Sequence, residues 1–264
     1  MSAPLPFEPH RFRVAAAHYR AGRPAYPPAL IRRAAEAVGL DDGHRVLDLG
    51  CGPGPLAIGF GYFAGEVLGL DPEPNMLAAA REAAQGLTPN VRFRQASSYD
   101  LGPELGLFRL VAMGRSFHWM DRADTLNRLD PLVEAGGAVV LFNDSHCDLP
   151  DNAWCKTWDD IVDRYSTADA TRKSRKAEGW LRHEAFLLAS PFCRLEQISI
   201  IARQVSTVES LVARALSMSS TSQGPADGAA DDLAREVREA LDRIAPDGRL
   251  TEVVEWSALV AKRR

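Results

Sequence analysis

A short glycine-rich turn that follows an apolar, strand-like segment constrains the fold of this chain more than any other feature. Residues 50–54 have the sequence GCGPG, and they come directly after the segment RVLDL at 45–49. Pro55 then falls where a helix would begin, a position that tolerates proline because its N–H has no helical partner. A strand, a glycine turn and a helix in this order are typical of the first unit of a nucleotide-binding α/β sheet.

The same alternation of strands and helices continues along the first half of the chain. After a helical segment at 30–38, apolar runs of strand length alternate with segments of helical period. The expected strands are 45–49, 67–70, 91–95, 108–113 and 138–142, and the expected helices are 56–64, 73–84 and 123–134. This rhythm predicts right-handed βαβ units and a parallel, doubly wound α/β sheet.

Beyond Asp144 the rhythm changes, which predicts inserted segments. The expected helices are 152–165, 177–189, 208–218 and 231–244, and the expected strands are 194–205 and 251–261. We predict a single domain over 1–264, with a core at about 27–145, 193–206 and 250–264 and helical insertions at about 150–190 and 207–245. Such insertions lie over the carboxyl ends of the strands, where open α/β sheets bind ligands.

Asp71 ends the second expected strand and narrows the choice of ligand. A carboxylate at this place can accept hydrogen bonds from both hydroxyls of a ribose. A dinucleotide fingerprint needs a third glycine at the position of Pro55, and this chain also has no Tyr-x-x-x-Lys pair after the fifth strand. An NAD(P)-dependent oxidoreductase is therefore the less favoured alternative.

Four segments resemble the motifs of class I S-adenosylmethionine-dependent methyltransferases, namely 46–54, 67–77, 94–101 and 132–140. The resemblance implies a Rossmann-like sheet of seven strands, the last one antiparallel, with inserted cap helices. It also implies S-adenosylmethionine as cofactor, S-adenosylhomocysteine as product, and a glycine turn that wraps the methionine portion of the cofactor. Asp71 would hold the ribose, Met76 would pack on the adenine, and Ser97 and Ser98 would meet the adenine edge. The cofactor residues implied in these segments are Asp48, Gly50, Cys51, Gly52, Gly54, Asp71, Pro72, Met76, Ser97 and Ser98.

The segment 17–27 resembles the N-terminal lid of small-molecule methyltransferases related to trans-aconitate methyltransferase. The resemblance implies that Tyr19 and Arg23 reach the carboxylate of the cofactor, with Arg20 as an alternative to Arg23. A bidentate pair between guanidinium and carboxylate suits that contact.

The segment 113–121 resembles a His-Trp motif of the same group. It adds Arg115 to the expected cofactor residues and places His118 and Trp119 beside the transferred methyl group and the acceptor. His118 could act as a general base, because an imidazole titrates near neutral pH. It could equally shape the pocket only, since methyl transfer needs little more than proximity and alignment.

The sequence leaves the methyl acceptor open. We expect a small molecule that is methylated on O, N or C, in a pocket among the inserted helices. Trp154 and Trp158 could line this pocket, although aromatic residues at helical spacing also fit a core. A second possibility is a protein that binds S-adenosylmethionine without catalysing a reaction.

Composition restricts the partners. A net charge of −4 argues against a nucleic-acid partner, because phosphate binding usually requires a basic face. Four cysteines form no C-x-x-C pair and no finger-like pattern with histidine, so we expect reduced thiols and a metal-independent protein. The apolar runs have strand length, which predicts a cytoplasmic protein with no membrane partner, as a monomer or homodimer.

Overall fold

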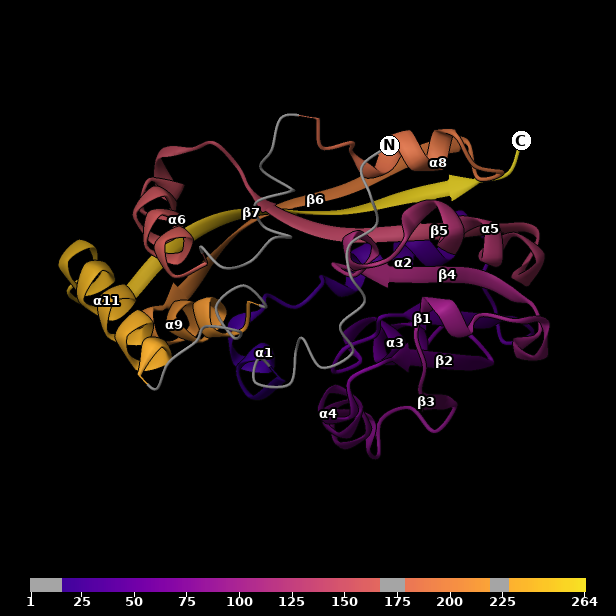
Figure 1. Ribbon diagram of the computed structural model, residues 1–264, viewed down its shortest axis with the longest axis horizontal. Helices are drawn as coiled ribbons and strands as arrows, with labels where there is room; N and C mark the ends of the chain where they lie inside the picture. Colours follow the sequence, from indigo (N-terminus) through magenta and orange to yellow (C-terminus); the bar gives the residue numbers. More distant parts are fainter. Residues whose placement is uncertain (1–15, 167–178, 219–227) are drawn as a thin grey trace.

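The computed structural model describes residues 16–166, 179–218 and 228–264, and its centre is a seven-stranded sheet (Figure 1). The strands lie in the order β3-β2-β1-β4-β5-β7-β6. They are β1 (Arg45–Leu49), β2 (Glu66–Asp71), β3 (Val91–Gln95), β4 (Phe108–Gly114), β5 (Val133–His146), β6 (Arg194–Thr207) and β7 (Arg249–Lys262). Strands β1 to β5 pair in parallel, and β7 runs antiparallel to both β5 and β6. The predicted fold class, a Rossmann-like α/β sheet of seven strands with the last one antiparallel, is confirmed.

Helices cover both faces of the sheet because alternate residues of a strand point to opposite sides. Val46 packs with Leu30 and Phe60, whereas its neighbour Leu47 packs with Phe117 and Leu126 on the other face. The described helices are α1 (Ala16–Gly22), α2 (Pro28–Ala37), α3 (Pro55–Phe60), α4 (Pro74–Ala84), α5 (Arg122–Leu129), α6 (Trp154–Tyr165), α8 (His183–Leu188), α9 (Val208–Leu216) and α11 (Ala229–Ile244). Short 3-10 turns are η1 (Ser98–Asp100), η2 (Pro103–Leu105), η3 (Phe117–Trp119), η4 (Asp130–Leu132) and η5 (Pro150–Asn152).

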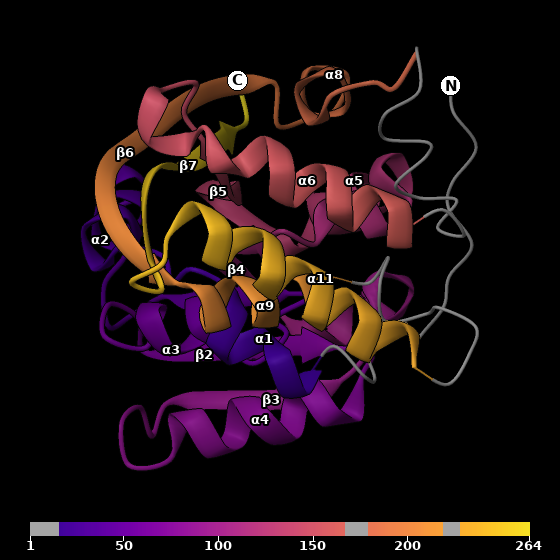
Figure 2. The same ribbon diagram turned by 90° about the vertical axis from the view of Figure 1, so that its left-hand side faces the viewer.

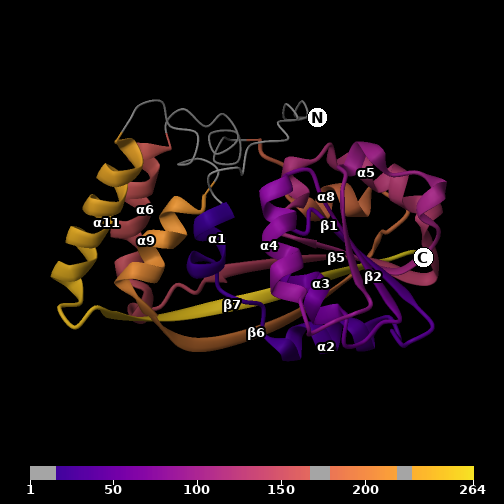
Figure 3. The same ribbon diagram turned by 90° about the horizontal axis from the view of Figure 1, so that it is seen from below.

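Strands β5, β6 and β7 each have 14 residues and carry three helices at one end. Figures 1 and 3 show α6, α9 and α11 together at this end, away from β1 to β4, and we call these three helices the helical lobe. Because β5 runs parallel with β1 to β4 and continues through η5 into α6, the lobe lies on the side of their carboxyl ends. Helix α1 packs beside α9 and also contacts α4 (Figures 2 and 3). The lobe and α1 therefore stand over the end of the sheet where a ligand is expected.

Several predicted boundaries were wrong. The helix predicted at 123–134 ends at Leu129, because Pro131 offers no N–H to continue it. The strand predicted at 138–142 is much longer, since its antiparallel pairing with β7 continues from Ala138 to His146. The helix predicted at 56–64 stops at Phe60, before Gly61. In the helix predicted at 177–189, residues 179–182 are not helical, and 177 and 178 lie outside the described residues.

Within the described ranges, we find no helix with both the length and the apolar character needed to span a bilayer.

Candidate functional site

The glycine turn lies where β1 ends and α3 begins, and it is fixed to the neighbouring strand. The N–H groups of Gly50 and Cys51 both donate to the carbonyl oxygen of Leu70, at 2.8 and 2.9 Å. Gly50, Gly52 and Gly54 have φ values of 71°, 54° and 80°, in the left-handed region that favours glycine. The turn thus holds a backbone shape that other residues would adopt only with strain.

Among the three glycines of the turn, Gly52 is the one whose missing side chain faces space that no described residue fills. A Cβ atom built there would meet no atom within 4 Å, whereas one at Gly50 would lie 2.6 Å from the Cβ of Ser116. Gly50 is therefore required by close packing against the segment after β4. Gly52 leaves room for a molecule outside the turn.

Asp71 connects the turn to the start of α4. Its Oδ2 accepts from the N–H of Gly52 and its Oδ1 accepts from the N–H of Glu73, each at 2.9 Å. The side chain is nearly buried, and burial raises the pKa of Asp71 to about 6 despite these two bonds. Each oxygen keeps a second lone pair, so the carboxylate can hold the turn and still accept from a ligand.

Asp48 lies beneath the turn and caps the helix that follows it. Its Oδ2 accepts from the N–H of Ala57 at 2.9 Å, which compensates for the lack of a capping side chain at Gly54. The residue is 1% exposed, and its Oδ1 has no hydrogen-bond partner among the described residues. Burial raises the pKa of Asp48 to about 7, and the nearby charge of Asp71 adds to this shift.

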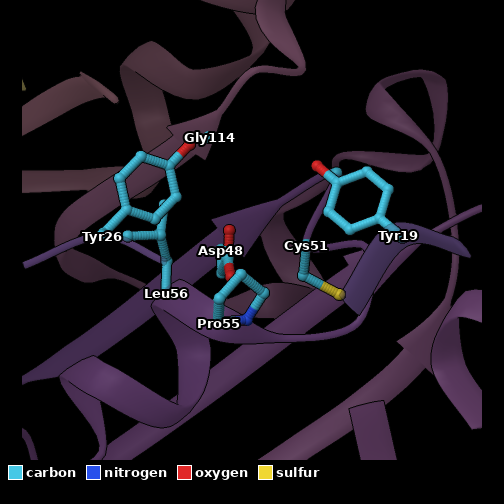
Figure 4. A pocket seen from close by; sticks show the side chains of 8 residues that line it. Tyr19, Tyr26, Asp48, Cys51, Pro55, Leu56 and Gly114 are labelled. Atoms are coloured by element: carbon cyan, nitrogen blue, oxygen red, sulfur yellow. The ribbon is translucent and has the colours of Figure 1, made fainter. Parts of the chain in front are cut away.

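A small pocket opens at the turn, with the Asp48 side chain between the rings of Tyr19 and Tyr26 (Figure 4). Its lining comes from α1, the segment before α2, the ends of β1 and β4, the glycine turn and the start of α3: Tyr19, Tyr26, Asp48, Gly50, Cys51, Pro55, Leu56 and Gly114. Sequence reasoning missed Tyr26. The sequence offers only one signal for Tyr26, its position in the segment 17–27. Its distinguishing property is burial, which the sequence does not show.

Arg115 follows β4 and has a φ of 55°. Among the described residues, it is the non-glycine residue whose backbone lies in the left-handed region. Such a conformation costs free energy and persists only where surrounding contacts enforce it. Here Nε pairs with Asp144, Nη2 donates to the carbonyl of Pro24 at 2.9 Å, and the guanidinium lies 4.6 Å from the centre of the Tyr26 ring. Arg115 therefore holds the segment before α2 against the carboxyl ends of β4 and β5.

Tyr19 and Arg23 lie close to each other beside the pocket. Tyr19 lines it, and the guanidinium of Arg23 lies 5.6 Å from the centre of the Tyr19 ring. Arg23 Nε donates to the hydroxyl of Ser217 at 3.0 Å, which ties α1 to the lobe. The side chain of Arg20, the alternative, lies outside the described residues.

The residues expected at the adenine end lie after β2 and β3. Met76 is buried in α4 beyond Pro72, and Ser97 and Ser98 follow β3. The hydroxyl of Ser97 already donates to Asp100 at 2.7 Å, where it caps η1. The Ser97 side chain therefore already makes hydrogen bonds within the protein.

His118 and Trp119 form η3, next to the turn. The two rings lie 4.6 Å apart, and the imidazole of His118 stacks on that of His183 in α8 at 6.3 Å and 20°. Nδ1 of His183 lies 3.4 Å from Nη1 of Arg122, whose guanidinium packs 4.3 Å from the Trp180 ring and 3.8 Å from the Phe186 ring. The first insertion therefore covers His118, a pairing that sequence spacing did not reveal.

Trp154 and Trp158 pack in the core of the helical lobe with Leu211 and Leu241. Their indole N–H groups donate to the carbonyls of Thr251 and Leu211, at 2.9 and 3.1 Å. They do not belong to the lining of the pocket at the turn. The structure thus gives both tryptophans a packing role in the lobe.

Comparison with known proteins fits this geometry. The methyltransferase domain family matches residues 46–137, which contain the glycine turn, Asp48 and Asp71. Residues 46–137 are therefore similar to a methyltransferase domain. The match begins in β1 and ends at Gly137, near the start of β5, so the matched region covers β1 to β4 and none of the lobe.

Curated relatives match less than half of this chain. The chain is 36% identical to a trans-aconitate 2-methyltransferase from Methylobacterium nodulans over 41% of this chain and 39% of the relative. It is 28% identical to a ubiquinone biosynthesis O-methyltransferase from Bradyrhizobium over 41% and 43%. The chain therefore spans less than half the length of these relatives.

A solved structure resembles the whole chain. An S-adenosylmethionine-dependent methyltransferase from Thiobacillus denitrificans, crystallised with S-adenosylhomocysteine, covers 99% of this chain and 100% of its own, with a TM-score of 0.55 and 18% identity. At this level of identity the likeness supports the fold alone. It shows that the sheet and the lobe together have a known architecture.

Proposed function

We propose that this chain binds S-adenosylmethionine and transfers its methyl group to a small-molecule acceptor. The observation that carries the proposal is the hydrogen bond from the N–H of Gly52 to the carboxylate of Asp71. Beside Gly52 lies space that no described side chain fills. Similarity to methyltransferases that include small-molecule enzymes supports the acceptor class. The expected cytoplasmic location, the monomeric or homodimeric state and the division into core and insertions remain predictions.

The residues around the pocket fit the parts of this cofactor. The second lone pairs of Asp71 suit ribose hydroxyls, the buried Asp48 suits a cation, and the guanidinium of Arg23 suits a carboxylate. The bound cofactor would supply an electrophilic methyl group. The chain's own residues would orient the acceptor, exclude water and, where the acceptor needs it, take up a proton.

Binding and turnover test the proposal separately. Calorimetric titration with S-adenosylhomocysteine and with NAD⁺ should give binding of the first and none of the second. Methyl transfer from labelled S-adenosylmethionine should then be measured against a panel of small hydroxyl, amine and carboxyl compounds. Binding of NAD⁺ alone would refute the proposal, and tight binding without turnover on a broad panel would favour a non-catalytic role.

We propose His118 as the general base for acceptors that lose a proton. The ring is nearly buried at η3, between Trp119 and His183. If this role holds, His118→Ala should lower kcat by about 100-fold or more and remove the acidic limb of its pH profile, with little change in cofactor affinity. His44→Ala, at the opposite end of β1, is the control. An unchanged pH–rate profile in His118→Ala would limit this residue to shaping the pocket.

Cofactor affinity should fall as the pH falls below about 7. An ionised Asp48 would accept from the cofactor's ammonium group, and burial raises the pKa of Asp48 to about 7 in the unliganded protein. One proton then competes with the ligand, which weakens binding by at most about tenfold per pH unit. Asp71 has a pKa of about 6, so its own protonation adds to this dependence near pH 6, and the range above pH 7 reports mainly on Asp48.

Asp48→Asn supplies the matched comparison for this pH dependence. The variant should bind S-adenosylhomocysteine more weakly and with a flatter profile between pH 6 and 8, where only the protonation of Asp71 remains. The stability of the unliganded wild type should depend on pH with the opposite sign. Because the pKa of Asp48 is higher in the folded than in the unfolded chain, protonated Asp48 stabilises the fold at a pH below the unfolded-state pKa. This contribution is lost as the pH rises through about 7. A wild-type affinity that is independent of pH would contradict the ionised role of Asp48.

A further inference from the structure

Helix α5 begins with a buried arginine, in a place that is unfavourable for a cation. Arg122 is the first residue of α5 and is 6% exposed. The partial positive charge at the N-terminal end of a helix repels a guanidinium, and burial removes the water around it. The rings of Trp180 and Phe186 lie 4.3 and 3.8 Å from the guanidinium carbon, and the carbonyl of Leu181 accepts from Nη1 at 2.8 Å. Because these three residues lie just before α8 or within it, Arg122 fastens α8 to α5.

The same guanidinium decides where the proton of His183 lies. Nη1 of Arg122 is 3.4 Å from Nδ1 of His183. A guanidinium can only donate hydrogen bonds and keeps its charge, so Nδ1 has to be the acceptor. In a neutral imidazole the other nitrogen then carries the proton. His183 is therefore neutral, with its proton on Nε2.

The ring of His183 lies beside the 3-10 turn that carries His118. Its centre is 6.3 Å from the centre of the His118 ring, with the planes 20° apart, and 5.2 Å from the centre of the Phe117 ring. A single 3-10 turn fixes the backbone of His118 but not the torsion angles of its side chain, which depend on packing. The rings of His183 and Trp119 therefore restrict the orientation of the His118 ring.

We propose that His183 is a positioning residue for His118. Its ring, held neutral by Arg122, restricts the His118 imidazole to one orientation and adds no further positive charge at 6.3 Å from it. This matters because a positive charge at that place would oppose the uptake of a proton by His118. The inference rests on the proposed function of His118 as general base, and it makes α8, in the first insertion, part of the same site.

The protonation state of His183 can be measured in the unliganded wild type. In the full chain labelled with nitrogen-15 at histidine, long-range proton–nitrogen spectra at pH 7 should show His183 with a protonated Nε2 and an unprotonated Nδ1. A proton on Nδ1 would overturn the inference, whether or not the protein binds S-adenosylhomocysteine. This measurement does not depend on the folding of any variant.

A double-mutant cycle tests the positioning role. With an acceptor that loses a proton, His183→Ala should lower kcat by about tenfold or more, with KM and the affinity for S-adenosylhomocysteine unchanged. In the His118→Ala background the same substitution should cause no further loss, because the group that His183 positions is absent. An equal loss in both backgrounds would overturn the inference. An unchanged kcat in His118→Ala would instead overturn the proposed base, and this inference with it.

Arg182→Gln is the matched control. It changes the residue next to His183, but the Arg182 side chain is 82% exposed and pairs with Glu184 at 2.6 Å. This variant should leave both kcat and the histidine spectrum unchanged. An equal loss of kcat in Arg182→Gln and His183→Ala would trace the effect to a disturbance of α8 rather than to the imidazole ring, and would overturn the positioning role.

Discussion

Gly52→Ala is expected to reduce the affinity for S-adenosylhomocysteine by more than about 100-fold while the protein still folds. The added methyl group would project into the space outside the turn, where the proposed cofactor lies, and it meets no protein atom within 4 Å there. Because Gly52 has a φ of 54°, the substitution also costs about 1–2 kcal/mol of backbone strain. Calorimetric titration gives the affinity, and thermal unfolding of the unliganded protein gives the strain.

Gly86→Ala separates strain from obstruction. Gly86 follows α4, has a φ of 74°, and its Cβ would likewise meet nothing within 4 Å. Both variants should lose similar stability, and only Gly52→Ala should lose ligand affinity. Equal binding by the two variants would refute the placement of the cofactor at the turn.

Glu252→Gln is expected to lower the free energy of unfolding by about 3–5 kcal/mol, because it leaves a buried guanidinium without its counter-charge. The Glu252 side chain is fully buried, and its two oxygens accept from Arg214 Nη1 and Nη2 at 2.9 and 3.0 Å. Although burial opposes ionisation, bonds from His146 and Arg214 hold the pKa of Glu252 well below its usual range. The stabilisation is therefore complete at pH 7 and is lost only in strong acid.

An exposed pair of the same geometry provides the control. Arg238 binds Glu209 through two nitrogens, each at 2.8 Å, but these side chains are 42% and 69% exposed. Solvent screening should limit the loss in Glu209→Gln to less than about 1 kcal/mol. Urea unfolding at pH 7 measures both losses, and similar values would show that burial of the Arg214–Glu252 pair adds nothing.

The Arg214–Glu252 pair also reaches the site. Nε of Arg214 donates to the carbonyl of Gly22 at the end of α1, at 3.0 Å. A Cβ at Gly22 would lie 2.3 Å from the backbone nitrogen of Arg214, so α1 and α9 meet backbone to backbone. The same pair that stabilises the lobe thus anchors the helix that carries Tyr19.

Local pattern was sufficient to predict the parallel sheet and the cofactor end of the site. Alternating strands and helices determine a parallel sheet, and the turn after β1 determines where its ligand end lies. Gly50, Gly52 and Gly54 were predictable because the positive φ values of this turn favour glycine. Asp71 was predictable because β2 must end beside that turn.

Only the tertiary structure decided which distant side chains complete the site. The bond from Arg115 to Pro24 joins residues 91 positions apart, and the stacking of His118 on His183 joins the end of β4 to an insertion. Periodicity tells which face of an element is apolar, but it does not tell which element will cover that face. The sequence by itself determined the glycine turn and its carboxylate, because both depend on neighbours in the chain. The buried hydroxyl of Tyr26 emerged only once packing had brought Arg115, Phe142 and Gly114 around it.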